Sequence, residues 1–272
     1  MSVQVDLKGQ TAVVTGASSG IGRAIAERIG ANGAHVILSG RTEAPMHESA
    51  TKITAAGGRA SVDVGDVRDP AVVRALVDRA VDADGRLDIF VNNAGYSVLG
   101  TVLDGEVDAW RSMLETNVLA LLVGCQAAVK AMRATGHPGH IINTSSVAAL
   151  SPDSGVYGAT KHAVNVITNS LRNELADDPI QISSVMPGLV ATNLGRENPE
   201  IVAGIVAMSG IEHDIKKGER LPDAVLERGQ AVLSEWIITP DDIADAVMYL
   251  LGAPGTVDVT DIVIRPNKAF DL

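Results

Sequence analysis

The segment TAVVTGASSGIG, residues 11–22, joins a short apolar run to a glycine-rich turn that opens directly into an amphipathic stretch. The run 11–15 predicts a buried strand, and residues 20–32 predict a helix. Glycines at such a junction permit a tight turn, a close approach of the backbone to a phosphate and close packing of the helix on the sheet. The free N–H groups at the start of that helix favour phosphate binding. The segment therefore predicts a strand–loop–helix unit that binds a nucleotide.

The glycines of this turn follow the spacing G-x-x-x-G-x-G instead of the usual G-x-G-x-x-G. The chain holds 27 glycines, so three of them are informative only because they lie between a clear strand and a clear helix. The alternative interpretation is a glycine-rich turn without a ligand. The turn residues that we expect to contact a cofactor are Gly16, Ser18, Ser19, Gly20, Ile21 and Gly22.

Short apolar runs alternate with longer amphipathic stretches along the rest of the chain. Runs such as TAVVT and HVILS are apolar on both faces, as expected for strands of a parallel sheet that helices cover. The pattern predicts strands at 11–15, 34–39, 60–64, 87–91, 140–144, 180–185 and 261–264, and helices at 20–32, 43–56, 71–81, 107–133, 156–176 and 241–251. This order predicts an α/β Rossmann fold, a doubly wound parallel sheet with helices on both faces.

The sequence contains no internal repeat and no linker, so we expect one domain over residues 1–272. The rhythm of strands and helices is interrupted at 195–236, which we expect to be irregular. A long irregular segment inside an α/β domain is typical of a lid over a substrate pocket.

The composition excludes several classes of protein. A net charge of −11 argues against nucleic-acid binding, which requires a basic face. The single cysteine, Cys125, cannot form an intrachain disulfide. The start MSVQVDLKGQ has no apolar signal core, and the longest strongly apolar run, 118–129, is shorter than the roughly 20 residues that a membrane span needs. We therefore expect a cytoplasmic protein that binds neither nucleic acid nor membrane.

The end of the second expected strand indicates which nucleotide binds. An acid at this position usually binds the ribose 2′-hydroxyl of NAD, whereas an arginine accommodates the 2′-phosphate of NADP. Gly40 stands at the acid's place and Arg41 follows it. The sequence therefore favours NADP(H) over NAD(H), and the alternative is that Arg41 is only a surface charge.

A second group of residues predicts the chemistry. Tyr157 and Lys161 lie four apart in a helical segment and so share one helix face. Ser145 and Ser146 follow the fifth expected strand, and Asn117 lies in the preceding helix. Ligands bind at the carboxyl ends of the strands in such sheets, where these elements meet.

These residue types suit the oxidation of a secondary alcohol or the reduction of a ketone. Tyrosine has a reference pKa of about 10, and a neighbouring ammonium together with an oxidised nicotinamide would lower it. A lowering of about 3 units, roughly 4 kcal/mol, is needed to reach neutral pH. A serine hydroxyl can hold the reacting oxygen during hydride transfer. The alternative is a half-buried helix tyrosine beside a solvated lysine.

The motifs TGASSGIG, NNAG at 92–95, SSV at 145–147, YGATK at 157–161 and PGLVAT at 187–192 together resemble the short-chain dehydrogenase/reductase family in order and spacing. The resemblance covers essentially the whole chain. It implies a Rossmann fold with seven strands and a catalytic tetrad of Asn117, Ser146, Tyr157 and Lys161. It also implies a homo-oligomer, a tetramer or a dimer, with the helices at 107–133 and 156–176 at an interface.

In the family, the lysine also binds the nicotinamide ribose, and the asparagine helps to hold a water in a proton relay. The resemblance implies cofactor contacts beyond the glycine turn and Arg41, at Asp66, Val67, Asn93, Ala94, Gly95, Tyr157, Lys161, Pro187, Gly188, Val190 and Thr192. The tail 261–266 is similar to a subset of reductases that prefer NADP.

The sequence thus predicts an NADP(H)-dependent oxidoreductase that interconverts a carbonyl and a secondary alcohol. One alternative is an NAD-dependent alcohol dehydrogenase that works oxidatively in a catabolic pathway. A second is a Rossmann protein that senses nucleotides without turnover. No metal site is expected, because no further ligand completes the pair His137 and His140. If the family geometry holds, an apolar pocket edged by Val98, Leu99, Val147 and Val190 would receive a modest, fairly apolar substrate.

Overall fold

The computed structural model describes residues 5–214 and 216–268. Its seven strands form one parallel sheet in the order β3-β2-β1-β4-β5-β6-β7. The strands are β1 (Thr11–Thr15), β2 (His35–Gly40), β3 (Arg59–Val64), β4 (Ile89–Asn92), β5 (Gly139–Thr144), β6 (Ile180–Pro187) and β7 (Asp261–Ile264). The predicted doubly wound α/β fold is confirmed.

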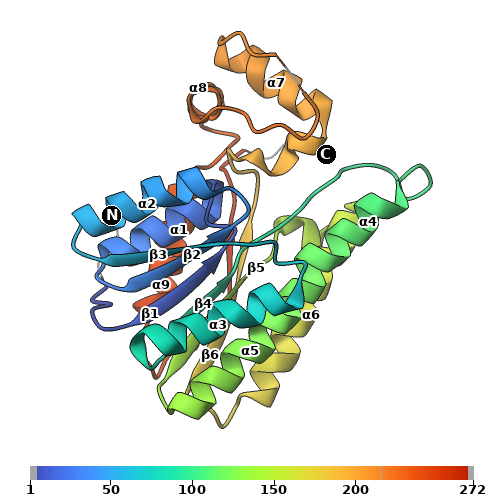
Figure 1. Ribbon diagram of the computed structural model, residues 1–272. Coiled ribbons are helices and arrows are strands. Elements are labelled where there is room, and N and C mark those ends of the chain that lie inside the picture. The colour runs from blue at the N-terminus through green and yellow to red at the C-terminus, as the bar shows by residue number, and fades with distance from the viewer. Residues whose placement is uncertain (1–4, 215, 269–272) are drawn as a thin grey trace.

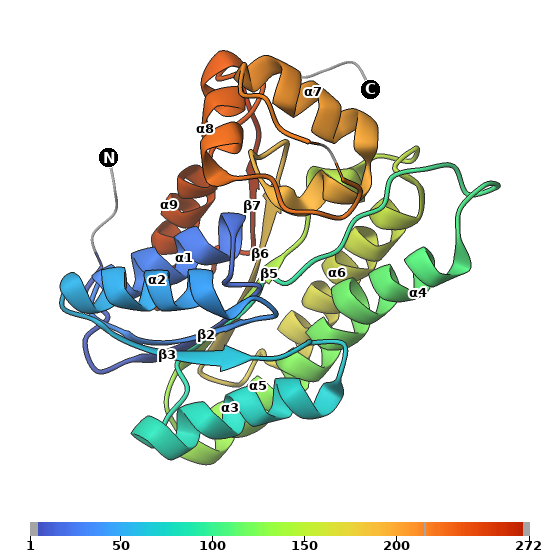
Figure 2. The same cartoon turned by 45° about the horizontal axis from the view of Figure 1, so that its top comes forward.

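Helices cover both faces of this sheet (Figures 1 and 2). The helices are α1 (Gly20–Ala31), α2 (Glu43–Ala55), α3 (Pro70–Asp84), α4 (Val107–Leu114), α5 (Ala120–Thr135), α6 (Gly155–Glu174), α7 (Pro199–Ser209), α8 (Asp223–Val232) and α9 (Pro240–Leu251). Short 3-10 turns lie at η2 (Val147–Leu150) and η3 (Asn193–Glu197). Helices α1, α2 and α9 pack on one face and α3, α5 and α6 on the other, which gives two separate hydrophobic cores.

The strand order reverses direction at β1, which pairs with both β2 and β4. At such a switch point the loops after neighbouring strands diverge and leave a crevice at the carboxyl edge. Strands β1, β2 and β4 are buried at every position, as two-sided covering requires. This edge therefore positions the phosphate loop after β1 beside the NNAG segment after β4.

Each predicted strand exists, with ends that shift by up to two residues. The helix expected at 107–133 is interrupted, because a π-helical segment, η1 (Glu115–Leu119), separates α4 from α5. The sequence shows no sign of this π-helical segment, because one wider turn hardly changes the spacing of apolar residues along a helix. Such π segments are frequent at functional sites.

The stretch 195–236 is more regular than expected. It contains α7 and α8, which form the upper lobe in Figure 1 and pack around a small core of Val202, Leu221, Val225 and Leu226. Helix α7 begins at Pro199, a favoured first helical residue, and ends before Gly210 at φ +65. The expectation of irregular structure was wrong there, because α7 is apolar over most of its length and shows no clear polar face, and α8 contains Gly229, a weak helix former.

The helical stretch Val107–Thr135 is long and apolar enough to meet the length and composition of a membrane span. It is longer than the apolar run 118–129 that the sequence suggested. Half of its most apolar window is buried inside the fold, and α5 forms part of one core. A core helix of a soluble protein has the same properties. Part of the chain's start, and residue 215 of the expected lid, lie outside the described residues.

Candidate active site

The glycine turn after β1 packs tightly against the NNAG segment. Gly16 has φ +68, and a Cβ placed on it would lie 2.9 Å from the Ala94 Cα. A Cβ on Gly22 would lie 2.3 Å from the Asn93 amide nitrogen. The Asn93 side chain donates to the Thr15 carbonyl at 2.9 Å, and the Ala94 N–H donates to the Thr15 hydroxyl at 3.0 Å. No larger residue fits at these two glycines, so the turn is fixed by its neighbours.

This turn suits a nucleotide phosphate. Within the described residues, the first turn of α1 has no acidic side chain and its N-cap, Ser19, makes no side-chain capping bond. The backbone N–H groups of that turn are therefore left for an outside anion. Gly20 has φ +53, and a Cβ there would lie 2.9 Å from the Thr192 methyl group. The segment PGLVAT thus closes over the glycine turn, as the resemblance implies for a bound cofactor.

The end of β2 carries the residues that distinguish the two nucleotides. A Cβ on Gly40 would lie 3.2 Å from the Ser18 hydroxyl, so the position has little room for an acidic side chain. Arg41 is exposed beside it. The Asp66 carboxylate accepts from the Arg68 guanidinium at 2.6 Å, and this bond lowers the pKa of Asp66. Asp66, the expected adenine contact, is therefore already paired with Arg68.

Tyr157, Ser146 and Lys161 come together at the ends of β5 and α6. The Ser146 hydroxyl shares a hydrogen bond with the Tyr157 phenol. The Lys161 Nζ lies 6.0 Å from the centroid of the Tyr157 ring and donates to the Thr144 carbonyl at 2.7 Å. Ser145 instead donates to the Lys161 backbone carbonyl at 3.1 Å. Ser146 thus contacts the tyrosine, whereas Ser145 holds the backbone of α6 at Lys161.

Burial dominates the pKa values of this pair. It raises the pKa of Tyr157 to about 12, opposed by the hydrogen bond from Ser146. Burial lowers the pKa of Lys161 to about 8. The lowering of the tyrosine pKa that we expected from a neighbouring ammonium is therefore absent from the protein by itself. The reason is that burial disfavours the charged phenolate more than the hydrogen bond from Ser146 favours it.

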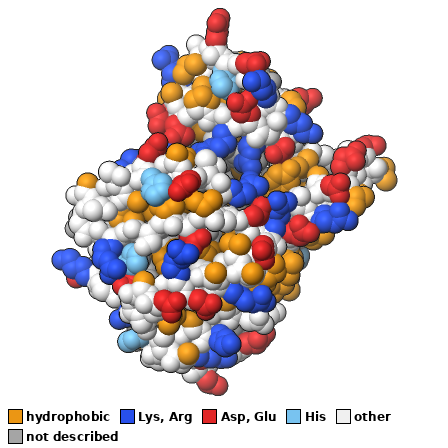
Figure 3. Space-filling model, in the orientation of Figure 1, with side chains coloured by type: hydrophobic (Ala, Val, Ile, Leu, Met, Phe, Trp, Pro, Cys, Tyr) orange, Lys and Arg blue, Asp and Glu red, His pale blue; other side chains and the backbone are white. Residues whose placement is uncertain are grey.

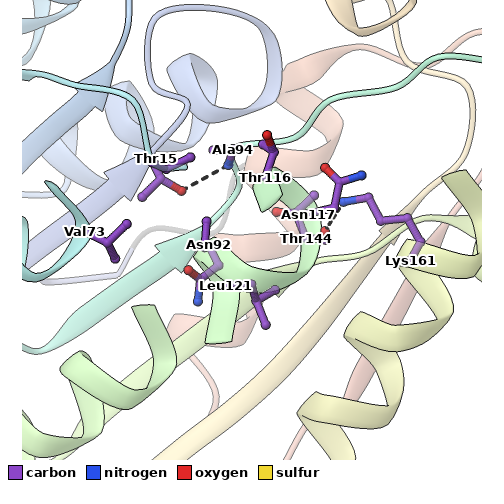
Figure 4. A pocket seen from close by; sticks show the side chains of 11 residues that line it. Thr15, Val73, Asn92, Ala94, Thr116, Asn117, Leu121, Thr144 and Lys161 are labelled. Atoms are coloured by element: carbon purple, nitrogen blue, oxygen red, sulfur yellow. Dashed lines mark hydrogen bonds between the residues drawn. The ribbon is translucent and has the colours of Figure 1, made fainter. Parts of the chain in front are cut away.

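Asn117 lies in η1 and connects three segments. Its Nδ2 donates to the Tyr96 carbonyl at 2.9 Å and to the Thr160 hydroxyl at 3.0 Å, and its Oδ1 accepts from the Tyr96 N–H at 2.9 Å. Figure 4 shows Asn117, Thr144 and Lys161 on one side of a cavity that Thr15, Asn92 and Ala94 also line. The cavity wall thus joins the end of β1, where the phosphate loop begins, to the lysine.

Sequence reasoning missed three supporting residues of this site: Tyr96, Thr144 and Thr160. Thr160 lies within the YGATK motif, directly before Lys161, and that neighbourhood was the available signal. Tyr96 follows NNAG directly. Thr144 acts through its backbone carbonyl, which carries no sequence signal.

Only two of the four residues that we expected to edge the substrate pocket line the same pocket. Val98 and Leu99 line a pocket with Trp110, Met113 and Val156, next to Tyr157 in the chain. Val147 and Val190 do not line that pocket. Val190 instead forms a bridge with Ile238. At the start of PGLVAT, directly after Pro187, the Gly188 N–H donates to the Ile264 carbonyl at 2.7 Å. This bond connects the segment to β7.

The histidine pair is also separated. His140 is buried in β5 and bonds the Ser183 hydroxyl at 2.9 Å, and burial lowers its pKa to about 4. In the described part of the chain, no group of three or more His, Cys, Asp or Glu side chains is placed to hold a metal ion.

Comparison with known proteins identifies the family. The model of the short chain dehydrogenase family matches residues 10–201, more than half of the chain. The chain belongs to the short-chain dehydrogenase family. An uncharacterized oxidoreductase of Methylorubrum extorquens is 40% identical over 251 residues, covering 90% of this chain and 91% of that protein. The predicted family and the class, an oxidoreductase that acts on CH–OH groups, are confirmed.

Solved members of the family resemble this short-chain dehydrogenase closely. One from Burkholderia cenocepacia, in complex with NADP, is 31% identical with a TM-score of 0.77, covering 96% of this chain and 98% of that one. Another from Burkholderia phymatum, in complex with NAD, is 26% identical with a TM-score of 0.75, covering 95% of this chain and 90% of that one. Similar structures thus bind either nucleotide.

Proposed function

We propose that this short-chain dehydrogenase is an NADP(H)-dependent oxidoreductase that interconverts a ketone or other carbonyl with a secondary alcohol. The observation that carries the proposal is the convergence of Ser146 and Lys161 on Tyr157 beside the phosphate loop. All four members of the tetrad are present, which disfavours a nucleotide sensor without turnover.

The roles of the residues follow from their environment. When bound, the nicotinamide cofactor supplies or accepts the hydride. In reduction, the Tyr157 phenol donates its proton to the carbonyl oxygen, and its raised pKa keeps it in the protonated form that this step needs. The Ser146 hydroxyl donates to the same oxygen and orients it. In oxidation, Tyr157 accepts the alcohol proton, and the Lys161 ammonium stabilises the phenolate.

Asn117 supports this chemistry from the same side of the cavity as Lys161. Its hydrogen bonds hold the Tyr96 backbone and Thr160, the residue before Lys161. It thereby keeps a polar path between the lysine and the interior of the cavity, where a water relay would pass protons. In this proposal the remaining cofactor contacts are those that the resemblance implies, with Arg41 at the 2′-phosphate.

NADP(H) is favoured because Gly40 leaves no acid at the end of β2 and Arg41 stands exposed beside it. Side-by-side fluorescence titrations of the purified protein with NADPH and NADH test this choice. Tighter binding of NADPH is expected. Tighter binding of NADH would contradict it and favour the NAD-dependent alcohol dehydrogenase.

A panel of apolar ketones with NADPH, followed by absorbance at the nicotinamide band, tests the reaction class. The apolar pocket formed by Val98, Leu99 and Val156 supports a modest, fairly apolar substrate. Absence of reduction with every ketone, and of oxidation with the matching alcohols, would contradict the proposal.

We also propose one cytoplasmic domain over 1–272, with 195–236 as its lid, that assembles into a homodimer or homotetramer. Large apolar side chains are exposed along α4, η1, α5 and α6, at Val107, Leu114, Leu119, Leu122 and Val166. Contiguous exposed apolar surface of this kind marks protein interfaces. A monomer by light scattering would contradict the assembly.

A further inference from the structure

One arginine of the upper lobe is placed unusually. Arg196 lies in η3, and its side chain is only 17% exposed. Its Nη1 donates to the Asn193 carbonyl at 3.0 Å. Among the described residues, its ion-pair partner is Glu197, whose carboxylate oxygen lies 3.9 Å from the Arg196 Nε. A guanidinium carries five N–H donors, so most donors of this half-sequestered cation are left without a close acceptor.

Other cations surround the same place. The charges of Arg41 and Arg220 oppose that of Arg196, and burial and Arg41 are the main causes that lower its pKa. Burial and the Glu197 carboxylate raise the pKa of the Tyr96 phenol, and the charges of Arg196, Arg41 and Arg68 oppose them. Figure 3 shows Lys and Arg side chains gathered in the hollow between the upper lobe and the body. Like charges that converge in a partly buried hollow repel one another, and because the Glu197 carboxylate faces several arginines here, a further anion among them would be stabilised.

The position of the hollow identifies the anion. Arg41 follows β2, where the 2′-phosphate of NADP binds in this fold. Thr192, which caps η3, rests against Gly20 of the phosphate loop, so η3 forms the facing wall of the same crevice. The anionic group therefore lies at the adenosine end of the crevice and away from the reacting carbonyl.

We propose that Arg196 is a second ligand of the cofactor's 2′-phosphate, presented by the lid region from the side opposite Arg41. The inference rests on the proposed NADP(H) dependence. A guanidinium can donate two parallel N–H bonds to a phosphate. Two arginines on opposite walls of the crevice therefore hold the 2′-phosphate more completely than the exposed Arg41 alone.

Such a contact ties the cofactor to the lid. The Arg196 carbonyl accepts from the Gly218 N–H at 3.0 Å, and the Asn193 side chain accepts from the Leu221 N–H at 2.7 Å. NADP(H) therefore fixes the start of the lid through its 2′-phosphate, whereas NAD(H) leaves this end free. The nucleotide's identity thereby influences the shape of the substrate pocket.

The test is a set of fluorescence titrations with NADPH and NADH on the wild type and on Arg196→Gln, Arg196→Lys and Arg41→Gln. Competition by 2′,5′-ADP and by 5′-AMP reports the 2′-phosphate without the nicotinamide. Arg228→Gln, an exposed lid arginine on α8, is the matched control for the loss of one charge. Arg196→Gln should weaken NADPH and 2′,5′-ADP about 10- to 100-fold, as expected for a charged hydrogen-bonded contact. NADH and 5′-AMP should change less than about 3-fold, and Arg196→Lys should retain part of the NADPH affinity.

Unchanged NADPH affinity in Arg196→Gln would overturn the inference, and so would an equal loss for NADPH and NADH, which indicates a pyrophosphate contact. Retained NADH binding in the same variant shows that the protein is folded. A wild type that prefers NADH would overturn the proposed cofactor and this inference together. A wild-type preference for NADPH that Arg41→Gln removes and Arg196→Gln keeps would overturn this inference alone.

Discussion

The carboxyl edge of the sheet and the upper lobe above it are built differently. At the edge, Asn117, Ser146 and Lys161 are each buried. Asn117 and Lys161 are hydrogen-bonded to other segments, and Ser146 caps η2 by accepting from the Ala148 N–H. The lobe has its own small core, and within the described residues its polar ties to the body include Arg23 with Asp223 at 2.8 Å. The proposed chemistry therefore lies in the body of the fold, and the proposed substrate contact lies in a lobe that can adjust with a small change in free energy.

The largest effect should come from the rigid edge. Tyr157→Phe removes the proton that the carbonyl oxygen receives, so kcat should fall about 10²- to 10⁴-fold. NADPH affinity should stay nearly unchanged, because the ring remains. Steady-state kinetics and a binding titration measure both quantities. Tyr249→Phe, on the exposed side of α9, is the control and should leave kcat unaltered. Full turnover in Tyr157→Phe would refute the assignment.

A matched pair of core substitutions separates the two regions. Val13 is fully buried in the body and Val225 is buried in the lobe core. Val13→Ala should lower the free energy of unfolding by about 2 kcal/mol, from lost burial and an added cavity. Val225→Ala should lower it less, while it raises the KM for the ketone and the rate of proteolysis in the lobe. Denaturant unfolding, kinetics and limited proteolysis provide the measurements. Equal losses of global stability would mean that the lobe unfolds with the body.

The buried lysine should give the edge a characteristic pH dependence. Burial lowers the pKa of Lys161 from 10.5 to about 8, so the unfolded chain binds more protons between these values. The stability of the wild type should therefore rise with pH across that window, and the cost of burying the charge is fully present below it. Lys161→Met removes this cost. The amount by which its free energy of unfolding exceeds that of the wild type should therefore shrink by on the order of 1 kcal/mol between about pH 7.5 and 9.5.

Thermal unfolding of the cofactor-free proteins across this range tests the sign. Lys130→Met, at an exposed position of α5, is the control and should show no such trend. Parallel curves for Lys161→Met and the wild type would indicate that the lysine is solvated in the folded protein.

The smallest effect should come from the ion pair that connects the lobe to the body. Asp223→Asn breaks the ion pair with Arg23, whose partners are 17% and 55% exposed. Exposed pairs contribute about 0.2–1 kcal/mol, so the melting temperature should hardly change. The lobe should nevertheless be cleaved faster by protease, and the difference should vanish at high salt. Glu227→Gln on α8 controls for the charge. An unchanged rate of cleavage would show that the hydrophobic core of the lobe, without this ion pair, is enough to keep the lobe folded.

Local patterns predicted much of the body correctly. The strand–turn–helix unit at residues 11–31, the alternation of strands and helices, and the helical spacing of Tyr157 and Lys161 were all legible from near neighbours in the chain. The lobe was harder to predict, because α7 (PEIVAGIVAMS) is apolar over most of its length and shows no clear polar face, and α8 contains Gly229, a weak helix former. The choice of Ser146 over Ser145 rested on its spacing to Tyr157, and the structure brings Ser146 to the phenol.

The sequence by itself determined the fold and the family, because these depend on residue types at short, regular spacings. Tertiary structure alone decided the π-helical turn and the bonds of Asn117 to residues 21 and 43 positions away. It also decided the direction in which the pKa of Tyr157 moves, because burial raises it and outweighs the hydrogen bond with Ser146. Burial and distant contacts arise only when separate segments pack together, and no local pattern specifies them.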